Sequence, residues 1–305
     1  MRPSGKWIDI DPESSVCDAA RRSLQARLTA VVHHLPLAAY HAQQDTEHVH
    51  RLRVSTRRAV AAQKIYRDWL PPKQGKWVRK RLRRIRRTAG TARDLDVLAE
   101  RLNREYGDCA APIVAKINQD RAGVHPAIVR LAKRMRRRDR FIRKTAKLVE
   151  GIGATSASSD AAAATPFRDW AALQLAEFAT QFFSAQPAAG ADIAALHQFR
   201  IRAKALRYAV EALAPAFGPE LRKVYYPVIE ELQERLGKIN DHVTARDQLR
   251  EWSVEVASDR DLFCEAADHE VARLTDEIAD FAEWWTPERA DQLSRALTQG
   301  TASTN

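Results

Sequence analysis

Cysteine is scarce in this chain, which has only Cys17, Cys109 and Cys264 among its 305 residues. An odd number of widely spaced cysteines argues against a disulfide framework. It also argues against a zinc knuckle, which needs paired ligands at close spacing. We therefore expect buried or half-buried free thiols, as is usual in a reducing compartment.

Long apolar runs are missing as well. No run approaches the ~20 residues that a membrane-spanning helix needs, and the stretch from Met1 to Asp9 has no apolar signal-peptide core. Both absences lead us to expect a cytoplasmic protein with no membrane partner. With 45% hydrophobic and 29% charged residues, the chain has the composition of a globular protein.

Strand patterns are also absent, because nowhere do β-branched and aromatic residues alternate over a strand length. Apolar residues instead recur at three and four positions, the helical period. The sequence therefore predicts an all-α fold. The expected helices cover 19–32, 46–69, 73–90, 98–106, 112–119, 126–150, 166–183, 192–213, 219–239, 241–255, 259–285 and a short segment after Pro287.

Proline and glycine set several of these expected helix ends. Pro36 should break or kink the first helix and Pro227 should kink a later one, because proline lacks a backbone donor. Gly90 should close the very basic helix that starts near Lys73. The small residues of 151–165 predict a linker. The expected parts are an irregular leader (1–15), helical halves 17–150 and 166–297, and a flexible tail (298–305).

Acidic residues are nearly absent from residues 50–93, where sixteen Lys and Arg accompany a single acid, Asp68. From Ala245 to the end, fourteen acids outnumber six arginines, although the whole chain carries +11. This segregation predicts a strong local positive field and a polyanionic partner. A single basic run is usually only a solvated face with no partner. Here several separate basic runs occur, which weakens that alternative.

Two stretches of the chain repeat one pattern of cations. In each, a histidine is followed by basic residues three and seven positions later: His50, Arg53 and Arg57 in the first stretch, and His197, Arg200 and Lys204 in the second. Positions i, i+3 and i+7 share one face of a helix. Each stretch therefore predicts a helix with a cationic stripe and an apolar side that anchors it.

The repeat extends beyond these helices. A shift of 147 positions superposes seven identical pairs among forty-five without a gap, and they include Pro72 on Pro219, Gly90 on Gly237 and Asp94 on Asp241. Most of the identities are charged residues or residues that affect the backbone. The prolines and glycines that are expected to start or end helices occupy equivalent positions in the two copies. Two helical halves joined by one linker are the natural interpretation.

These motifs resemble the CHAD domain, the conserved histidine α-helical domain. The first half matches at His50, Arg53, Val54, Arg57, Arg58, Gly90, Arg93, Asp94, Asp96 and Val97. The second half matches at His197, Arg200, Ile201, Lys204, Arg207, Tyr208, Glu211, Leu232, Gln233, Gly237, Asn240 and Asp241. One departure is Glu230-Glu231, where the family tends to be basic and the first half has Arg83-Arg84. The binding surface should therefore be lopsided.

The resemblance implies one domain over 16–297, made of two pseudo-symmetric four-helix bundles around a central basic pore or cleft. It also implies binding of inorganic polyphosphate and an association with bacterial polyphosphate granules and their proteins. We expect no cofactor and no catalysis, because the basic stripes contain neither clustered acids for Mg²⁺ nor a nucleophile with a base. The expected polyphosphate ligands are His50, Arg53, Arg57, Arg58, Arg79, Arg83, Arg86, Arg93, His197, Arg200, Lys204, Arg207 and Lys238. Asp94, Asp241 and Tyr208 are expected to orient neighbouring side chains, the two acids either as helix caps or as partners of an arginine.

Several alternatives stay open. The histidines are alternatively hydrogen-bonded bundle residues, and the seven tryptophans are expected to serve packing. Arg-rich helices also suit nucleic acid, although no helix-turn-helix, zinc finger or aromatic RNA motif is present. An enzyme acting on polyphosphate or a triphosphate is the third class. It would need clustered acids for Mg²⁺, for which Asp94 and Asp96 are the candidates.

Overall fold

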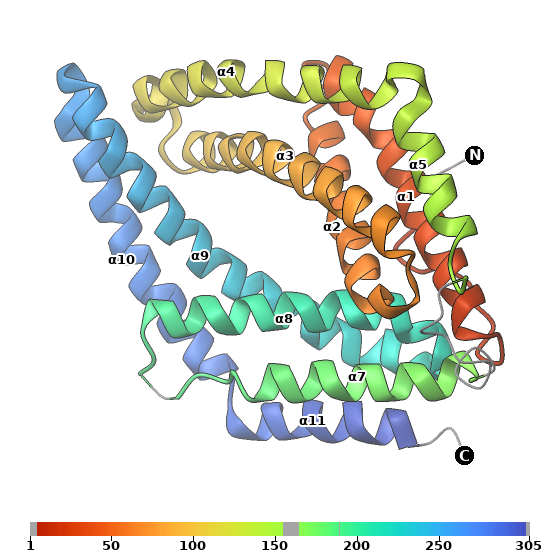
Figure 1. Ribbon diagram of the computed structural model, residues 1–305. Coiled ribbons are helices and arrows are strands. Elements are labelled where there is room, and N and C mark those ends of the chain that lie inside the picture. Colours follow the sequence, from red (N-terminus) through yellow and green to blue (C-terminus); the bar gives the residue numbers. More distant parts are fainter. Residues whose placement is uncertain (1–4, 155–164, 189, 303–305) are drawn as a thin grey trace. The chain divides into compact units, whose positions relative to one another are not determined.

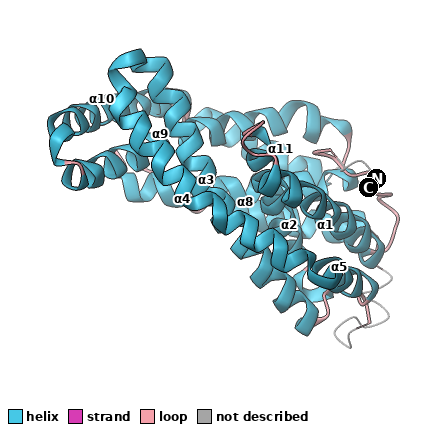
Figure 2. Cartoon of the chain, turned by 90° about the horizontal axis from the view of Figure 1, so that it is seen from above, coloured by secondary structure: helices cyan, strands magenta, loops and turns pink. Residues whose placement is uncertain are grey.

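The computed structural model describes residues 5–154, 165–188 and 190–302 (Figure 1). These residues are mostly helical, and they contain no strand beyond an isolated bridge between Ser15 and Pro166 (Figure 2). The predicted all-α fold is confirmed. The chain divides into two compact units, Met1–Trp170 and Ala171–Asn305, which we describe one at a time. No described helix is long and apolar enough to cross a membrane.

The first unit is built from five long helices. They are α1 (Val16–Tyr40), α2 (Glu47–Ile65), α3 (Pro72–Tyr106), α4 (Ala111–Arg136) and α5 (Arg140–Glu150). Successive helices pack on one another from α1 to α4, and α5 packs on α1 and α3 (Figure 1). Ser15 caps α1, because its side chain accepts from the backbone N–H of Asp18. Burial at helical spacing, as at Leu24, Leu28 and Val31, joins α1 to the core.

The second unit takes up α7 (Phe167–Phe183), which begins at the end of the first unit, and four further helices. These are α8 (Ile193–Leu213), α9 (Tyr226–Glu255), α10 (Arg260–Trp284) and α11 (Pro287–Ala302). α9 packs on both α8 and α10. Aromatic rings form the centre of the core, with Phe182 stacked on Phe199 at 4.8 Å and Trp285 at 5.7 Å from Phe199.

The helix predicted to close at Gly90 runs on to Tyr106. The reason is that the apolar period continues without interruption, and Ala89, Ala92 and Leu95 are all buried. A single glycine costs a helix only about 1 kcal/mol relative to alanine, which such burial outweighs. Asp94 therefore lies within α3 and is not a helix cap.

The prolines end fewer helices than predicted. α1 continues through Pro36 to Tyr40, and α4 runs through Pro126, where a new helix was expected to begin. The predicted helix 126–150 instead divides at 137–139, where Arg138 and Asp139 both have positive φ. Because the chain changes direction at this turn, α5 packs on α1 and α3 and buries Phe141 and Leu148.

The two helices predicted over 219–255 are one. A π-helical turn at Leu221–Tyr225 precedes Pro227, and α9 then continues through Gly237 and Asp241 to Glu255. The wider turn accommodates a proline, which has no N–H to donate to the preceding turn. Asp241, like its counterpart in the first half, is therefore not a helix cap.

Segments outside the long helices also differ from expectation. The described part of the leader is irregular but attached, because the buried Arg27 guanidinium donates to the carbonyls of Gly5 and Lys6 at 3.0 and 2.7 Å. Cys109 is exposed, in contrast to the buried or half-buried thiol expected there. α11 extends to Ala302, into the predicted tail. Residues 155–164 of the predicted linker and 303–305 of the tail lie outside the described residues.

Candidate functional site

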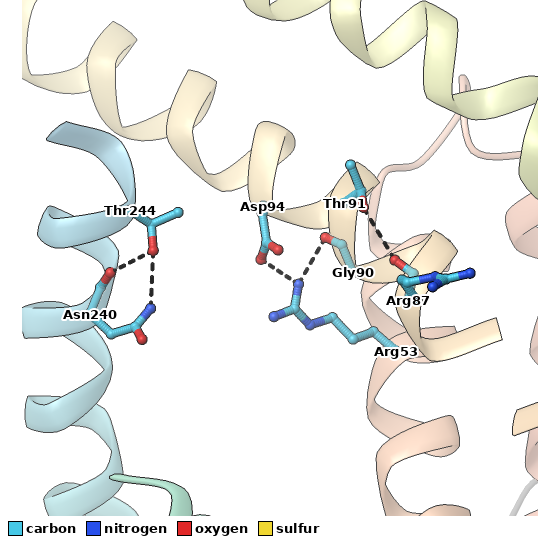
Figure 3. Close-up of polar contacts among 7 residues, drawn as sticks. All are labelled: Arg53, Arg87, Gly90, Thr91, Asp94, Asn240 and Thr244. Atoms are coloured by element: carbon cyan, nitrogen blue, oxygen red, sulfur yellow. Dashed lines mark hydrogen bonds and ion pairs between the residues drawn. The ribbon is translucent and has the colours of Figure 1, made fainter. Parts of the chain in front are cut away.

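The predicted cations of the first unit gather mainly along α2 and α3. We call this set the α2–α3 stripe; it consists of His50, Arg53, Arg57, Arg79, Arg83, Arg86 and Arg93. Arg53 ties the two helices together, because its Nη1 donates to the Gly90 carbonyl at 3.0 Å and to Asp94 Oδ1 at 2.5 Å (Figure 3). Its side chain is 17% exposed. One of the central predicted ligands is thus held in place by its own helix pair.

His50 lies half-buried among cations of the same stripe. Burial lowers its pKa; Glu47 opposes this effect, and Arg93, Arg53 and Arg57 add to it. In the protein without ligand, the imidazole is therefore neutral at pH 7 and has one ring N–H to donate. The nearby guanidiniums mark a place where an anion would be favoured.

The four residues that α3 contributes to the stripe, Arg79, Arg83, Arg86 and Arg93, differ in their surroundings. Arg79 and Arg83 line a hollow of about 680 Å³ at the start of α3, together with Arg67, Asp68, Leu70, Pro72, Lys76 and Lys80. Arg86 is exposed, whereas Arg93 forms an ion pair with Glu100 at 3.2 Å. Arg93 therefore already has a carboxylate partner, which an incoming phosphate would have to displace.

Arg58 does not belong to this stripe. Neighbouring helical residues are turned by about 100°, so Arg58 points away from Arg57. It lines a separate hollow of about 240 Å³ with Arg27, Ala30, His34, Glu47, His50, Arg51, Val54 and Ser55. The eight predicted ligands of the first unit thus do not all line one surface, and His50 borders both surfaces.

In the second unit, α8 places three predicted ligands on one face. His197 is exposed, and Arg200 and Lys204 are half-buried. His197 Nδ1 lies 3.3 Å from Asn240 Oδ1. Asn240 Nδ2 in turn donates to Thr244 Oγ1 at 3.3 Å (Figure 3). Lys238 lies 3.9 Å from Glu277. As in the first unit, the helix with the histidine packs on the long helix that follows it.

Arg207 lies in a cluster of carboxylates. Its guanidinium is 3.4 Å from Glu211 and 4.0 Å from Glu230, and Tyr226 donates its hydroxyl to Glu211 at 2.6 Å. Burial and the Glu211 carboxylate raise the pKa of Tyr226, so its proton stays in this bond. The neighbouring ring of Tyr208 is buried, with the Arg207 guanidinium 5.2 Å from its centre. The second unit thus neutralises part of its own charge.

The candidate carboxylates for Mg²⁺ are paired with arginines. Asp94 binds Arg53, and Asp96 accepts from Arg121 at 2.6 Å with only 7% of its side chain exposed. Asp241 is exposed on α9. Among the described residues, no group of three or more His, Cys, Asp or Glu side chains is placed to hold a metal.

Trp77 is a residue whose surroundings sequence reasoning missed. It was expected to serve packing alone, but Arg81 lies over its ring at 5.1 Å and Arg140 at 5.8 Å. The i, i+4 spacing of Trp77 and Arg81 was visible in the sequence. The approach of Arg140 depends on the turn at 137–139, which no sequence pattern indicated.

Comparison with known proteins agrees with this helical architecture. The sequence profile of a family described as the CHAD domain matches residues 22–250. The CHAD domain from the plant Ricinus communis is similar in structure, with 21% sequence identity, a TM-score of 0.70, and 98% of this chain and 96% of that chain covered. So is PptA from Streptomyces chartreusis, with 18% identity, a TM-score of 0.57, and coverage of 95% and 100%. At such identities the likeness shows the fold alone. No curated protein sequence matches the chain.

Proposed function

This chain belongs to the CHAD domain family, and on that premise we propose that it binds inorganic polyphosphate through the α2–α3 stripe and the basic face of α8. A polyphosphate chain carries about one negative charge per phosphate. Cations one helical turn apart, at ~5–6 Å, can follow such a chain along its length. Arginine suits this ligand, because its planar guanidinium donates two parallel hydrogen bonds to phosphate oxygens.

The observation that carries this proposal is the row of unpaired cations on α3. Within the described residues, no carboxylate pairs with Lys76, Arg79, Arg83, Arg86 or Arg87. Like charges this close repel one another at a cost to the fold. A polyanion relieves that repulsion, which gives the binding free energy a physical source. Arg53 and His50 border the row from α2.

We propose binding without catalysis. The two candidate carboxylates for a metal ion, Asp94 and Asp96, already bind arginines. Phosphate release from polyphosphate and from a nucleoside triphosphate, measured with Mg²⁺ and with Mn²⁺, tests this part. We expect no release above the protein-free rate, and turnover that requires Asp94 or Asp96 would contradict it.

We also propose that the protein accompanies polyphosphate granules in the cytoplasm. A polyanion concentrated in a granule would retain a protein whose charged surface is basic. A fluorescent fusion expressed in cells that form granules should co-localise with them. Co-localisation that persists when polyphosphate synthesis is abolished would point to a granule protein as the partner instead.

The direct test is binding of labelled polyphosphate of graded length to the whole protein. Affinity should rise with chain length and fall steeply with salt, because counterions are released on binding. Competition with duplex and single-stranded DNA at equal charge concentration separates this function from nucleic-acid binding. Affinity independent of length, or DNA that competes equally, would overturn the proposal.

A further inference from the structure

A second group of cations lies on the first unit, where α3 packs on α4 and α5 and the start of α5 approaches Trp77. We call it the α3–α5 corner; its residues are Trp77, Arg81, Arg84, Arg134 and Arg140. In the part of the chain that the structure describes, none of these four guanidiniums pairs with a carboxylate. Residues 130–147 carry ten Lys and Arg but a single acid, Asp139.

The corner is separate from the α2–α3 stripe. Arg79 of the stripe and Arg81 of the corner are two residues apart on α3, which turns them roughly 200° from each other. Arg53 reaches α3 at Gly90 and Asp94, while Arg140 reaches it at Trp77. α3 therefore carries cations on two opposite edges, and each edge can be altered without the other.

Trp77 fixes the geometry of the corner. Arg81 from α3 and Arg140 from α5 both lie over its ring, and the ring centre is 6.3 Å from that of Phe141. Cation–π contact holds a guanidinium without neutralising it, so both keep their donors for an anion. Because the ring already carries two guanidiniums, it is poorly placed to stack on a nucleic-acid base.

The electrostatic environment agrees with this geometry. The pKa of Arg81 is lowered by burial and then by Arg140, Arg134 and Arg84, and no acid offsets them. Next to these residues, Arg138 and Asp139 both adopt positive φ, a conformation that costs about 1 kcal/mol or more for each residue. The fold therefore brings like charges together at this turn, although doing so is unfavourable in the protein alone.

We propose that the α3–α5 corner is a second phosphate-binding site, which holds another segment of the same class of ligand, linear polyphosphate. This inference rests on the proposed function for the identity of the ligand, but it uses different residues. Two sites on opposite edges of α3 would let one long polyphosphate chain contact both. Once the chain is held at one site, the effective concentration of its phosphates at the other site is raised. Long chains would then bind more tightly than the stripe alone allows.

The test uses tripolyphosphate as a short probe and tryptophan emission as a local readout, with the full chain at low salt. The corner variant is R81Q/R134Q/R140Q, and R104Q/R260Q/R295Q removes the same charge from exposed arginines elsewhere. We expect tripolyphosphate to change the emission of the wild type, and we expect Trp77→Phe to lose part of that change. The corner variant should bind long polyphosphate several-fold more weakly than the charge-matched variant.

The outcomes separate this inference from the proposed function. If R53Q/R200Q binds long polyphosphate more weakly than the wild type but keeps the Trp77-dependent change of emission with tripolyphosphate, both proposals stand. If Trp77→Phe responds like the wild type and the corner variant binds like its charge-matched control, the corner is not a site, whatever the stripe does. If binding at the corner is seen only with duplex DNA, the assignment to polyphosphate is overturned.

Discussion

At the scale of single residues, Arg53 is a proposed phosphate ligand whose position is already fixed by contacts within the first unit. Its guanidinium is already fixed on α3 by Gly90 and Asp94, so less side-chain freedom is lost on binding. The sequence identified Arg53 and Asp94 through the motifs, and their mutual contact follows from how α2 packs on α3. Arg207 differs from Arg53, because two carboxylates surround its guanidinium, Glu211 from the same helix and Glu230 from α9. Part of its charge is therefore already neutralised.

His50 leads to a prediction about pH. Its pKa is lowered in the free protein, chiefly by burial, and a bound polyanion would raise it. Protons are then taken up on binding, so affinity for polyphosphate should increase several-fold as pH falls from about 7 to about 5. Titrations over this range should show a smaller increase in His50→Gln. An equal increase in wild type and variant would assign the effect to other groups.

His34 leads to a prediction about stability. Burial, followed by the charges of His33, Arg51 and His48, lowers its pKa to about 4. The unfolded chain, with a pKa near 6.5, therefore binds more protons than the fold between these values, and stability is lost as pH falls through that window. Between pH 6.5 and pH 4 the free energy of unfolding should fall by roughly 1 kcal/mol less in His34→Gln than in the wild type, allowing for solvent screening. Denaturant unfolding measures this difference. An unchanged pH slope would contradict this.

At the scale of helices, the repeat of 147 positions is visible in burial. Leu82, Ile85 and Ala92 are buried on α3, and their counterparts Ile229, Leu232 and Ile239 are buried on α9. Helix type and apolar faces were thus predictable from periodicity. Helix ends were not, because whether a proline or glycine interrupts a helix depends on the burial around it. The turn at 137–139 had no sequence signal at all.

Gly90 gives the prediction at this scale. A Cβ there would lie 3.9 Å from Arg53 Nη1, an ordinary contact. Gly90→Ala should therefore stabilise the protein by about 0.5–1 kcal/mol through helix propensity and change polyphosphate affinity less than twofold. Thermal unfolding tests this, with Gly237→Ala as the matched control because no atom lies within 4 Å of its Cβ. Destabilisation by Gly90→Ala alone would mean that Arg53 needs the glycine.

At the scale of the whole molecule, the distribution of charge matters more than the sum. Acids in the second half engage its cations, as Glu230 and Glu231 do with Arg207 and Arg235, whereas Arg83 and Arg84 on α3 are exposed. The sequence predicted this lopsidedness from Glu230-Glu231. Which cations are neutralised depended on distances between helices, so it required the structure.

This asymmetry predicts a difference in salt dependence. Each cation that contacts a phosphate adds roughly 0.7 to the slope of log affinity against log salt for a single-stranded polyanion. R83Q/R86Q should therefore reduce the slope by about 1 to 1.5, and Arg207→Gln should barely change it. Binding isotherms at four or more salt concentrations measure both. A larger reduction from Arg207→Gln would place the dominant contacts in the second unit.

The most direct test of polyphosphate binding by the repeated cations is a comparison of two double variants. R53Q/R200Q neutralises one arginine of each motif, and it avoids the second carboxylate that glutamate would place beside Asp94. R104Q/R295Q removes the same charge from exposed positions outside the motifs. The affinity of R53Q/R200Q for long polyphosphate should be about tenfold or more below that of R104Q/R295Q, since hydrogen bonds to charged groups contribute about 1.5–3 kcal/mol each. Equal affinities of the two variants would contradict the assignment of polyphosphate binding to these motifs.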